Sequence, residues 1–122
     1  MKTFRQILTE SDKTDKIVNK YLNFIAPRAT GTSDSSLKGI IDLVKTDNKK
    51  AKDTKFELTN QEIESVIKEL TRIYTIYLKR KIKTFPKNWA RDKVEKDMLN
   101  MMDLTTHGIK KITDKYNKMY SK

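Results

Sequence analysis

The stretch from Thr59 to about residue 83 constrains the fold more than any other part of the chain. Its apolar residues recur every three or four positions, which is the period of one face of an α-helix. A face this broad is wider than a coiled-coil seam, and it predicts a helix that contacts neighbours on two sides. The residues of the face are Ile63, Val66, Ile67, Leu70, Ile73, Tyr74, Tyr77 and Leu78.

Local signals mark both ends of this helix. Thr59 and Glu62 have the spacing of a capping box, in which two side chains bind free amides of the first turn. Leu58 and Ile63 flank the cap as a hydrophobic staple, which fixes the angle at which the chain enters the helix. Pro86 ends the helix, because proline lacks the N–H that would continue the ladder. The sequence thus predicts one long helix with two defined ends.

The composition favours an all-helical fold. The 122 residues include three glycines and two prolines, and they show no alternating runs of β-branched and aromatic residues. The length suits one domain, and the hydrophobic content of 36% suits a modest core. We therefore expect an all-α fold, a small helical bundle of four to five helices with a long central helix at about 59–83.

Two shorter helices are predicted before the central one. The first spans about 14–26 and is ended by Pro27, because the residue before proline avoids the helical region. Its apolar residues are Ile17, Tyr21, Phe24 and Ile25. Residues 27–36 have the composition of a loop. The apolar residues of the second helix are Leu37, Ile40, Ile41 and Val44. Residues 45–57 lack an apolar period and carry five lysines, so we expect a flexible charged connector there.

Two further helices are predicted toward the C-terminus. The first of them begins near Pro86 or Lys87, since proline is tolerated in a first turn. Its core residues are Trp89 or Ala90, then Val94, Met98, Met101 and Met102. The three methionines suit a core at this spacing, and methionines also occur at adaptable interfaces. Gly108 breaks or bends the chain, which places His107 at a helix C-terminus, where a cation offsets the dipole. The last helix carries Ile109, Ile112, Tyr116, Met119 and Tyr120.

The strongest charged feature spans residues 79–96, which carry eight Lys and Arg against Asp92 and Glu95. Two aromatic rings lie within it. Cations bind phosphates with release of counterions, and flat rings stack on unpaired bases. A site for nucleic acid or an acidic partner is therefore predicted at Lys79, Arg80, Lys81, Lys83, Phe85, Lys87, Trp89 and Arg91.

The same residues also suit a solvated end of the bundle, with Trp89 as a core plug and Phe85 at the helix end. The formal net charge of +11 attracts polyanions, but chains rich in Lys, Ile and Asn are often basic without such a role. No helix-turn-helix, zinc-finger or strand-borne aromatic signature is present, which argues against sequence-specific reading of DNA.

Catalysis has little support in the sequence. There is no cysteine, so disulfides, thiolate metal sites and a thiol nucleophile are excluded. His107 is the only histidine and has no partner at the spacing of a metal or catalytic motif. A glycine-rich phosphate loop is also absent. We therefore expect no enzyme, no metal and no cofactor. No apolar run approaches the length of a membrane span, so no membrane partner is expected either.

The first ten residues, Met1–Glu10, form a short amphipathic stretch whose apolar stripe is Phe4, Ile7 and Leu8. The decapeptide resembles the capsid-targeting peptide of internal head proteins from tailed phages of the T4 type. Met-Lys-Thr-aromatic at the start, an apolar pair at Ile7–Leu8 and the motif Leu8-Thr9-Glu10 match that peptide. Arg5 and Gln6 depart from it, since a polar and then an acidic residue stand there in the family.

The resemblance implies a cleavage site, and it also implies where the protein is packaged and where it acts. A prohead protease would cut after Glu10, within the motif Leu8 to Ser11, and leave a single helical domain of residues 11–122. The prohead protease and the capsid core would be partners. The domain would be packaged in the capsid interior, ejected with DNA into the host cytoplasm, and act there by binding DNA or an acidic host defence protein.

Two alternatives remain open at this stage. The chain is also compatible with a non-virion basic phage protein that binds nucleic acid or the host transcription machinery, with residues 1–10 packed as a helix. It is also compatible with a structural component of the virion held by helix packing.

Overall fold

The computed structural model describes the backbone of residues 4–25 and 32–120, and the side chains from residue 14 onward within these ranges. Over this part of the chain the fold is all-helical, with five helices and no strand. They are α1 (Phe4–Ile25), α2 (Leu37–Lys50), α3 (Asn60–Ile82), α4 (Arg91–Met101) and α5 (Thr106–Tyr120). The predicted all-α bundle with a long central helix is confirmed, because α3 is the longest helix and packs against three others.

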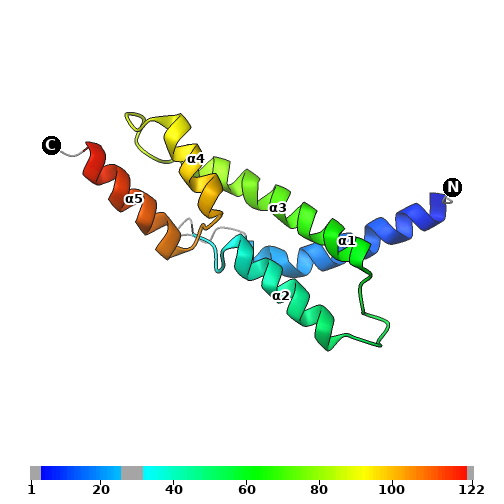
Figure 1. Cartoon of the computed structure of the whole chain (residues 1–122). Coiled ribbons are helices and arrows are strands. Elements are labelled where there is room, and N and C mark those ends of the chain that lie inside the picture. Colours follow the sequence, from blue (N-terminus) through cyan, green and yellow to red (C-terminus); the bar gives the residue numbers. More distant parts are fainter. Residues whose placement is uncertain (1–3, 26–31, 121–122) are drawn as a thin grey trace.

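α3 is the axis of an elongated molecule (Figure 1). α1 and α2 pack against its first half, α4 packs against its second half, and α5 packs on α4. Successive helices run in alternating directions along this axis. We call α1, α2 and the first half of α3 the N-terminal half, and the rest of α3 with α4 and α5 the C-terminal half.

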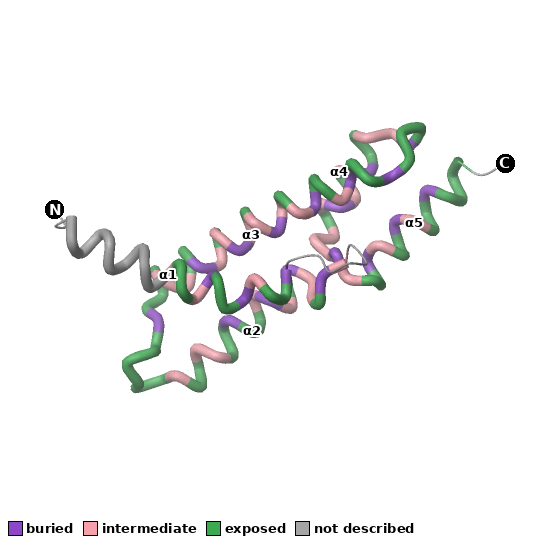
Figure 2. The backbone as a smooth tube through the Cα atoms, turned by 180° about the vertical axis from the view of Figure 1, so that it is seen from behind, coloured by how far each residue is buried: buried purple, intermediate pink, exposed green. Residues whose placement is uncertain are grey.

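The central helix forms as its end signals predict. The Thr59 hydroxyl accepts a hydrogen bond from the Glu62 amide at 3.1 Å, and the Glu62 carboxylate accepts one from the Thr59 amide at 3.0 Å. Leu58 is buried just before the cap, and Ile63 packs against the core after it. One side of the helix is buried along its whole length (Figure 2). The buried residues are Val66, Leu70, Tyr74, Leu78 and Ile82.

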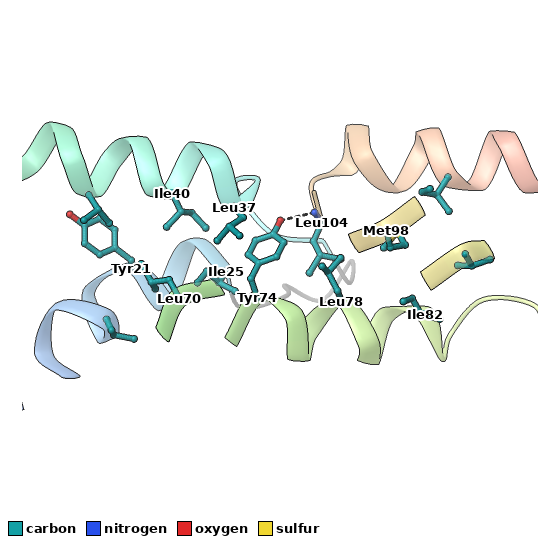
Figure 3. Close-up of a cluster of buried hydrophobic side chains, with 14 of the residues drawn as sticks. Tyr21, Ile25, Leu37, Ile40, Leu70, Tyr74, Leu78, Ile82, Met98 and Leu104 are labelled. Atoms are coloured by element: carbon teal, nitrogen blue, oxygen red, sulfur yellow. Dashed lines mark hydrogen bonds between the residues drawn. The ribbon is translucent and has the colours of Figure 1, made fainter. Parts of the chain in front are cut away.

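The two halves meet at Tyr74, in the middle of α3 (Figure 3). Its hydroxyl donates to the Ser35 carbonyl at 2.9 Å and accepts from the Leu104 amide at 2.6 Å. Beside it, amides of segment 33–37 donate hydrogen bonds of 2.9 and 3.0 Å to carbonyls of segment 102–104. The side chain is fully buried. Its hydroxyl therefore satisfies one backbone group from the connection between α1 and α2 and one from the connection between α4 and α5.

The N-terminal helix is longer than predicted. We expected a helix from about residue 14 after a separate decapeptide, but α1 is one continuous helix from Phe4 to Ile25. The polar run 11–14 contains no Gly or Pro. Relative to alanine, each of its residues lowers the stability of a helix by about 0.7 kcal/mol at most, so the run does not interrupt α1. The side chains of Phe4, Ile7 and Leu8 lie outside the described residues, as does Pro27.

The charged connector expected over 45–57 is wrong in its first half, because α2 continues to Lys50. Lysines in a last helical turn interact favourably with the helix dipole, so their number does not end the helix. The rest is a short turn attached to α2 by the side-chain amide of Asn48. The Asn48 oxygen accepts from the Leu58 amide at 2.7 Å, and its nitrogen donates to the Leu58 carbonyl at 3.3 Å.

The start of α4 also differs from the prediction. The helix begins at Arg91, whereas residues 86–89 form a turn closed by a 3.2 Å bond from the Trp89 amide to the Pro86 carbonyl. The turn places Trp89 in the core. Of the three methionines, Met98 is buried and the other two pack against the core, as expected of core residues at helical spacing.

Gly108 does not break a helix. α4 stops at a left-handed residue, Met102 with φ 47°, and Gly108 lies in the first turn of α5. A Cβ at this glycine would lie 2.4 Å from the Asp103 carbonyl oxygen, so the glycine permits the close approach of the connection to the helix. His107 therefore lies at a helix N-terminus and not at the C-terminus that we predicted. Of the apolar residues assigned to the last helix, Tyr120 is 37% exposed, and Met119 is exposed as well.

Candidate nucleic-acid interface at the basic end

Three segments meet at the far end of the C-terminal half, where α3 ends, α4 begins and α5 ends (Figure 1). The Tyr120 hydroxyl on α5 accepts a 2.9 Å hydrogen bond from the Ala90 amide before α4. We call this surface, formed by residues 79–93 and 115–120, the basic end. It joins the predicted cluster of 79–91 to the last turns of α5, which the sequence does not place beside it.

Positive charge is concentrated in this part of the chain. Residues 79–120 contain twelve Lys and Arg against five Asp and Glu, which gives a net +7 of the total +11. Apart from Lys115, which is paired with Asp97, the cations that are exposed at the basic end are Lys79, Arg80, Lys83, Lys87, Lys93 and Lys118. The Arg80 guanidinium lies 5.4 Å from the centre of the Tyr77 ring, which holds that side chain against α3.

These six cations are not neutralised by the protein. Within the part of the chain that the structure describes, none of them lies within 4.0 Å of a carboxylate. α3 and α5 both end here, and their C-terminal dipoles favour nearby cations by about 0.3–1 kcal/mol each. The helix dipoles attract these six cations but do not cancel their charge. The surface therefore has a positive potential.

Two of the predicted binding cations have other surroundings. The Arg91 guanidinium donates to the Ile82 carbonyl and, at 3.2 Å, to the Phe85 carbonyl. It therefore binds carbonyls at the end of α3 and just beyond it, and its role is to fix the turn between α3 and α4. Lys81 is half-buried. The cations left for a ligand are the exposed ones.

The stacking role predicted for Phe85 and Trp89 is wrong. Their side chains are only 8% and 4% exposed, so neither ring offers a face to a base. The Trp89 ring lies between those of Phe85 and Tyr116, with centroid distances of 5.3 Å on both sides. Trp89 is thus the core plug of the alternative interpretation, and among the rings of the basic end Tyr120, which is 37% exposed, is the one that a ligand can reach.

The acidic residue closest to this stack is held by the protein itself. The Asp97 carboxylate on α4 accepts hydrogen bonds from the Lys115 ammonium at 2.7 Å and the Tyr116 hydroxyl at 2.6 Å, both on α5. These bonds, that of Lys115 first, hold the pKa of Asp97 below its usual range. Burial, and then the bond to Asp97, raises the pKa of the Tyr116 phenol. These contacts fix α5 on α4, and the charges of Asp97 and Lys115 offset each other.

The predicted cleavage residues are not placed by side chain. Leu8, Glu10 and Ser11 have side chains outside the described residues, although their backbone lies within α1. Elsewhere, no group of three or more His, Cys, Asp and Glu with the geometry of a metal site occurs among the described residues. No described helix is both long and apolar enough to cross a membrane.

Comparison with known proteins gives no match: no family model, no curated protein and no solved structure is significantly similar to this chain.

Proposed function

We propose that this protein binds the phosphate backbone of nucleic acid through the basic end, and that it acts by binding and not by catalysis. The observation that supports the proposal is the set of exposed cations without carboxylate partners around the junction of α3, α4 and α5. Each phosphate neutralised by such a cation releases counterions, which supplies affinity without any contact to a base.

The surroundings of the cations favour the backbone of a duplex over unpaired bases. Proteins that bind single strands combine a basic groove with exposed aromatic rings, and three of the four rings at this end, those of Phe85, Trp89 and Tyr116, are buried. Phosphate contacts position a protein on DNA but carry no sequence information. The proposed binding is therefore insensitive to sequence and strongly dependent on salt.

The test compares two variants of equal charge. The basic-end variant combines Lys79→Ala, Arg80→Ala, Lys83→Ala and Lys87→Ala. The matched control combines Lys38→Ala, Lys45→Ala, Lys50→Ala and Lys68→Ala, all at exposed positions away from this end. Binding to a duplex of mixed sequence is measured by fluorescence anisotropy over a series of salt concentrations.

The basic-end variant should lose most of the affinity, and its salt slope should fall by about 0.9 for each phosphate contact removed. The control should keep the slope of the unaltered protein. Equal losses in the two variants would show that only the net charge matters, and the assigned surface would then be wrong.

We further propose a setting for this binding, inside a phage head. Its support is the match of residues 1–10 to the targeting peptide of internal head proteins. On this proposal the chain is cut after Glu10 by the prohead protease. Because residues 8–11 lie within α1, the first turns must open before a protease can bind the site in extended form.

Intact-mass analysis of protein recovered from virions tests the setting. A chain that begins at Ser11 supports it. A virion chain that still begins at Met1 would favour a structural component that keeps its first helix. Absence of the protein from virions would favour the non-virion alternative, in which a basic phage protein binds nucleic acid or the host transcription machinery.

A further inference from the structure

A groove of about 390 Å³ lies at the other end of the molecule from the basic end. It is bounded by α1, by the end of α2 and by the turn of residues 51–58 (Figure 1). Ile17, Val44 and Leu58 supply apolar walls, and the aliphatic part of the surface continues onto Ala51. Its volume is near the lower end of the range of about 300–1,000 Å³ typical of ligand pockets. We call it the α1–α2 groove.

An aromatic residue stands exposed at the edge of the groove. Phe56 lines the groove, yet 69% of its side chain is exposed, the largest exposure among the large hydrophobic residues described. The Lys55 ammonium lies 5.2 Å from the centre of its ring. An exposed ring beside an apolar depression is the arrangement found at the centre of protein interfaces, where aromatic residues contribute most of the binding energy.

The charge around the groove has one dominant sign. Lys16, Lys20 and Lys55 line it, against a single acid, Asp47. The Asp47 carboxylate accepts a 2.5 Å hydrogen bond from the Tyr21 hydroxyl and lies 3.7 Å from the Lys20 ammonium. Because Asp47 and Lys20 offset each other, an occupant of the groove meets apolar walls with the exposed Lys55 at the rim.

We propose that the α1–α2 groove docks an acidic amphipathic helix of a partner protein. Apolar side chains of that helix fill the groove and cover Phe56, and its flanking carboxylates face Lys55. A nucleic acid does not suit this surface, since its phosphates and sugars gain nothing from the apolar walls. The groove and the basic end share no residue, so this proposal stands independently of the proposed nucleic-acid binding.

The experiment uses the full chain and two displayed peptide libraries of helical pattern. In both libraries Leu, Ile, Phe or Met occupy positions i, i+3, i+4 and i+7; the other positions are Glu and Ala in one library, and Lys and Ala in the other. The peptides selected should come from the acidic library. Their affinity, measured by anisotropy, should fall about tenfold or more in Phe56→Ala and in Lys55→Glu.

Two variants serve as matched controls. Leu43→Ala removes a 37% exposed apolar side chain of α2 outside the groove, and Lys38→Glu reverses a lysine outside it. Both should bind the selected peptides as the unaltered protein does. Circular dichroism of Phe56→Ala should be unchanged, because the lost side chain is largely exposed.

Several outcomes would overturn the proposal. Selection of no peptide, equal selection from the basic library, or equal binding to Phe56→Ala would each exclude a docked acidic helix. Binding of dodecanoate, used as a probe for small amphiphilic anions, without binding of any peptide would assign the groove to a small molecule. Self-association in sedimentation that Phe56→Ala abolishes would assign it to a second copy of this chain.

Discussion

The two halves of the molecule use the same bond to hold their outer helices together. In the N-terminal half, Tyr21 of α1 donates to Asp47 of α2, and in the C-terminal half, Tyr116 of α5 donates to Asp97 of α4. In each case a lysine directly before the tyrosine lies within 4.0 Å of the same carboxylate. Each half thus contains a pair of helices joined by one tyrosine and one aspartate. Both helices of the N-terminal pair pack along α3, whereas in the C-terminal pair α4 packs on α3 and α5 packs on α4.

What surrounds the two bonds is different. Beside Tyr116 a continuous series of rings fills the space, namely Phe85, Trp89, Tyr116 and Tyr120. Beside Tyr21 there is a groove with an exposed phenylalanine at its edge. The C-terminal half therefore presents mainly charge at its surface, with Met119 and Tyr120 exposed near its end, whereas the other half presents an apolar depression with a lysine at its rim. This contrast is why we assign nucleic acid to one end and a protein helix to the other.

The largest effect that distinguishes the halves is expected from the ring series. Trp89→Ala removes a side chain that lies between two rings and is 4% exposed, so it should lower the free energy of unfolding by about 3–5 kcal/mol. Urea denaturation followed by circular dichroism measures this loss. Phe56→Ala, at the exposed ring of the other half, should change the stability by less than about 0.5 kcal/mol.

A different result would change the comparison. If Trp89→Ala were nearly as stable as the unaltered protein and bound DNA more weakly, the ring would be a binding platform and not a core residue.

A smaller loss is expected from the link between the halves. Tyr74→Phe keeps the buried ring but leaves the Leu104 amide without its partner, at a cost of about 1–3 kcal/mol, and it removes one of the two donors to the Ser35 carbonyl, which keeps the Ser33 hydroxyl. Because the bonds join segments of both halves, amide hydrogen exchange should accelerate at 33–37 and 102–104 together. Acceleration in only one segment would show that the halves are held independently.

The sequence predicts contacts between residues that are close in the chain better than contacts between residues that are far apart in it. The capping box of Thr59 and Glu62 is local, so three residues of spacing suffice to predict it. The role of Tyr74 depends on backbone groups 30 and 39 residues away, which no periodicity indicates.

The basic end shows the same limit. Its charges were predictable by counting, whereas the burial of Trp89 depends on Tyr116, which α5 brings beside it from the C-terminal end of the chain. The role of Gly108 likewise follows from contact with Asp103 and not from its own propensity to end a helix. The α1–α2 groove had no sequence signal, since its lysines lie on two separate segments.

The smallest effect is expected from the two tyrosine bonds at alkaline pH. Burial first, and then the bonded aspartate, raises the pKa of both the Tyr21 and the Tyr116 phenol. A tyrosine phenol in the unfolded chain ionises at about pH 10. The folded phenols remain protonated beyond that, so the stability they contribute is complete below about pH 10 and is lost as the pH rises further.

Removal of each hydroxyl should therefore lower stability at neutral pH by about 0.5–1.5 kcal/mol and flatten its decline above about pH 10. Tyr21→Phe should cost more than Tyr116→Phe at neutral pH. Asp97 keeps a 2.7 Å bond to Lys115, while Asp47 keeps only a lysine at 3.7 Å. Urea denaturation at a series of pH values measures both effects, and the opposite order would mean that the lysines do not share these carboxylates.

The central claim is that nucleic acid is bound at the basic end by charge alone. Titration of the ¹⁵N-labelled protein with duplex DNA at low salt, with tryptophan fluorescence recorded in parallel, tests it most directly. The account predicts amide shifts over 79–93 and 115–120, none around the α1–α2 groove, and unchanged emission from Trp89, the one tryptophan of the chain. Shifts centred on the groove, or quenching of Trp89 by the bound DNA, would contradict it.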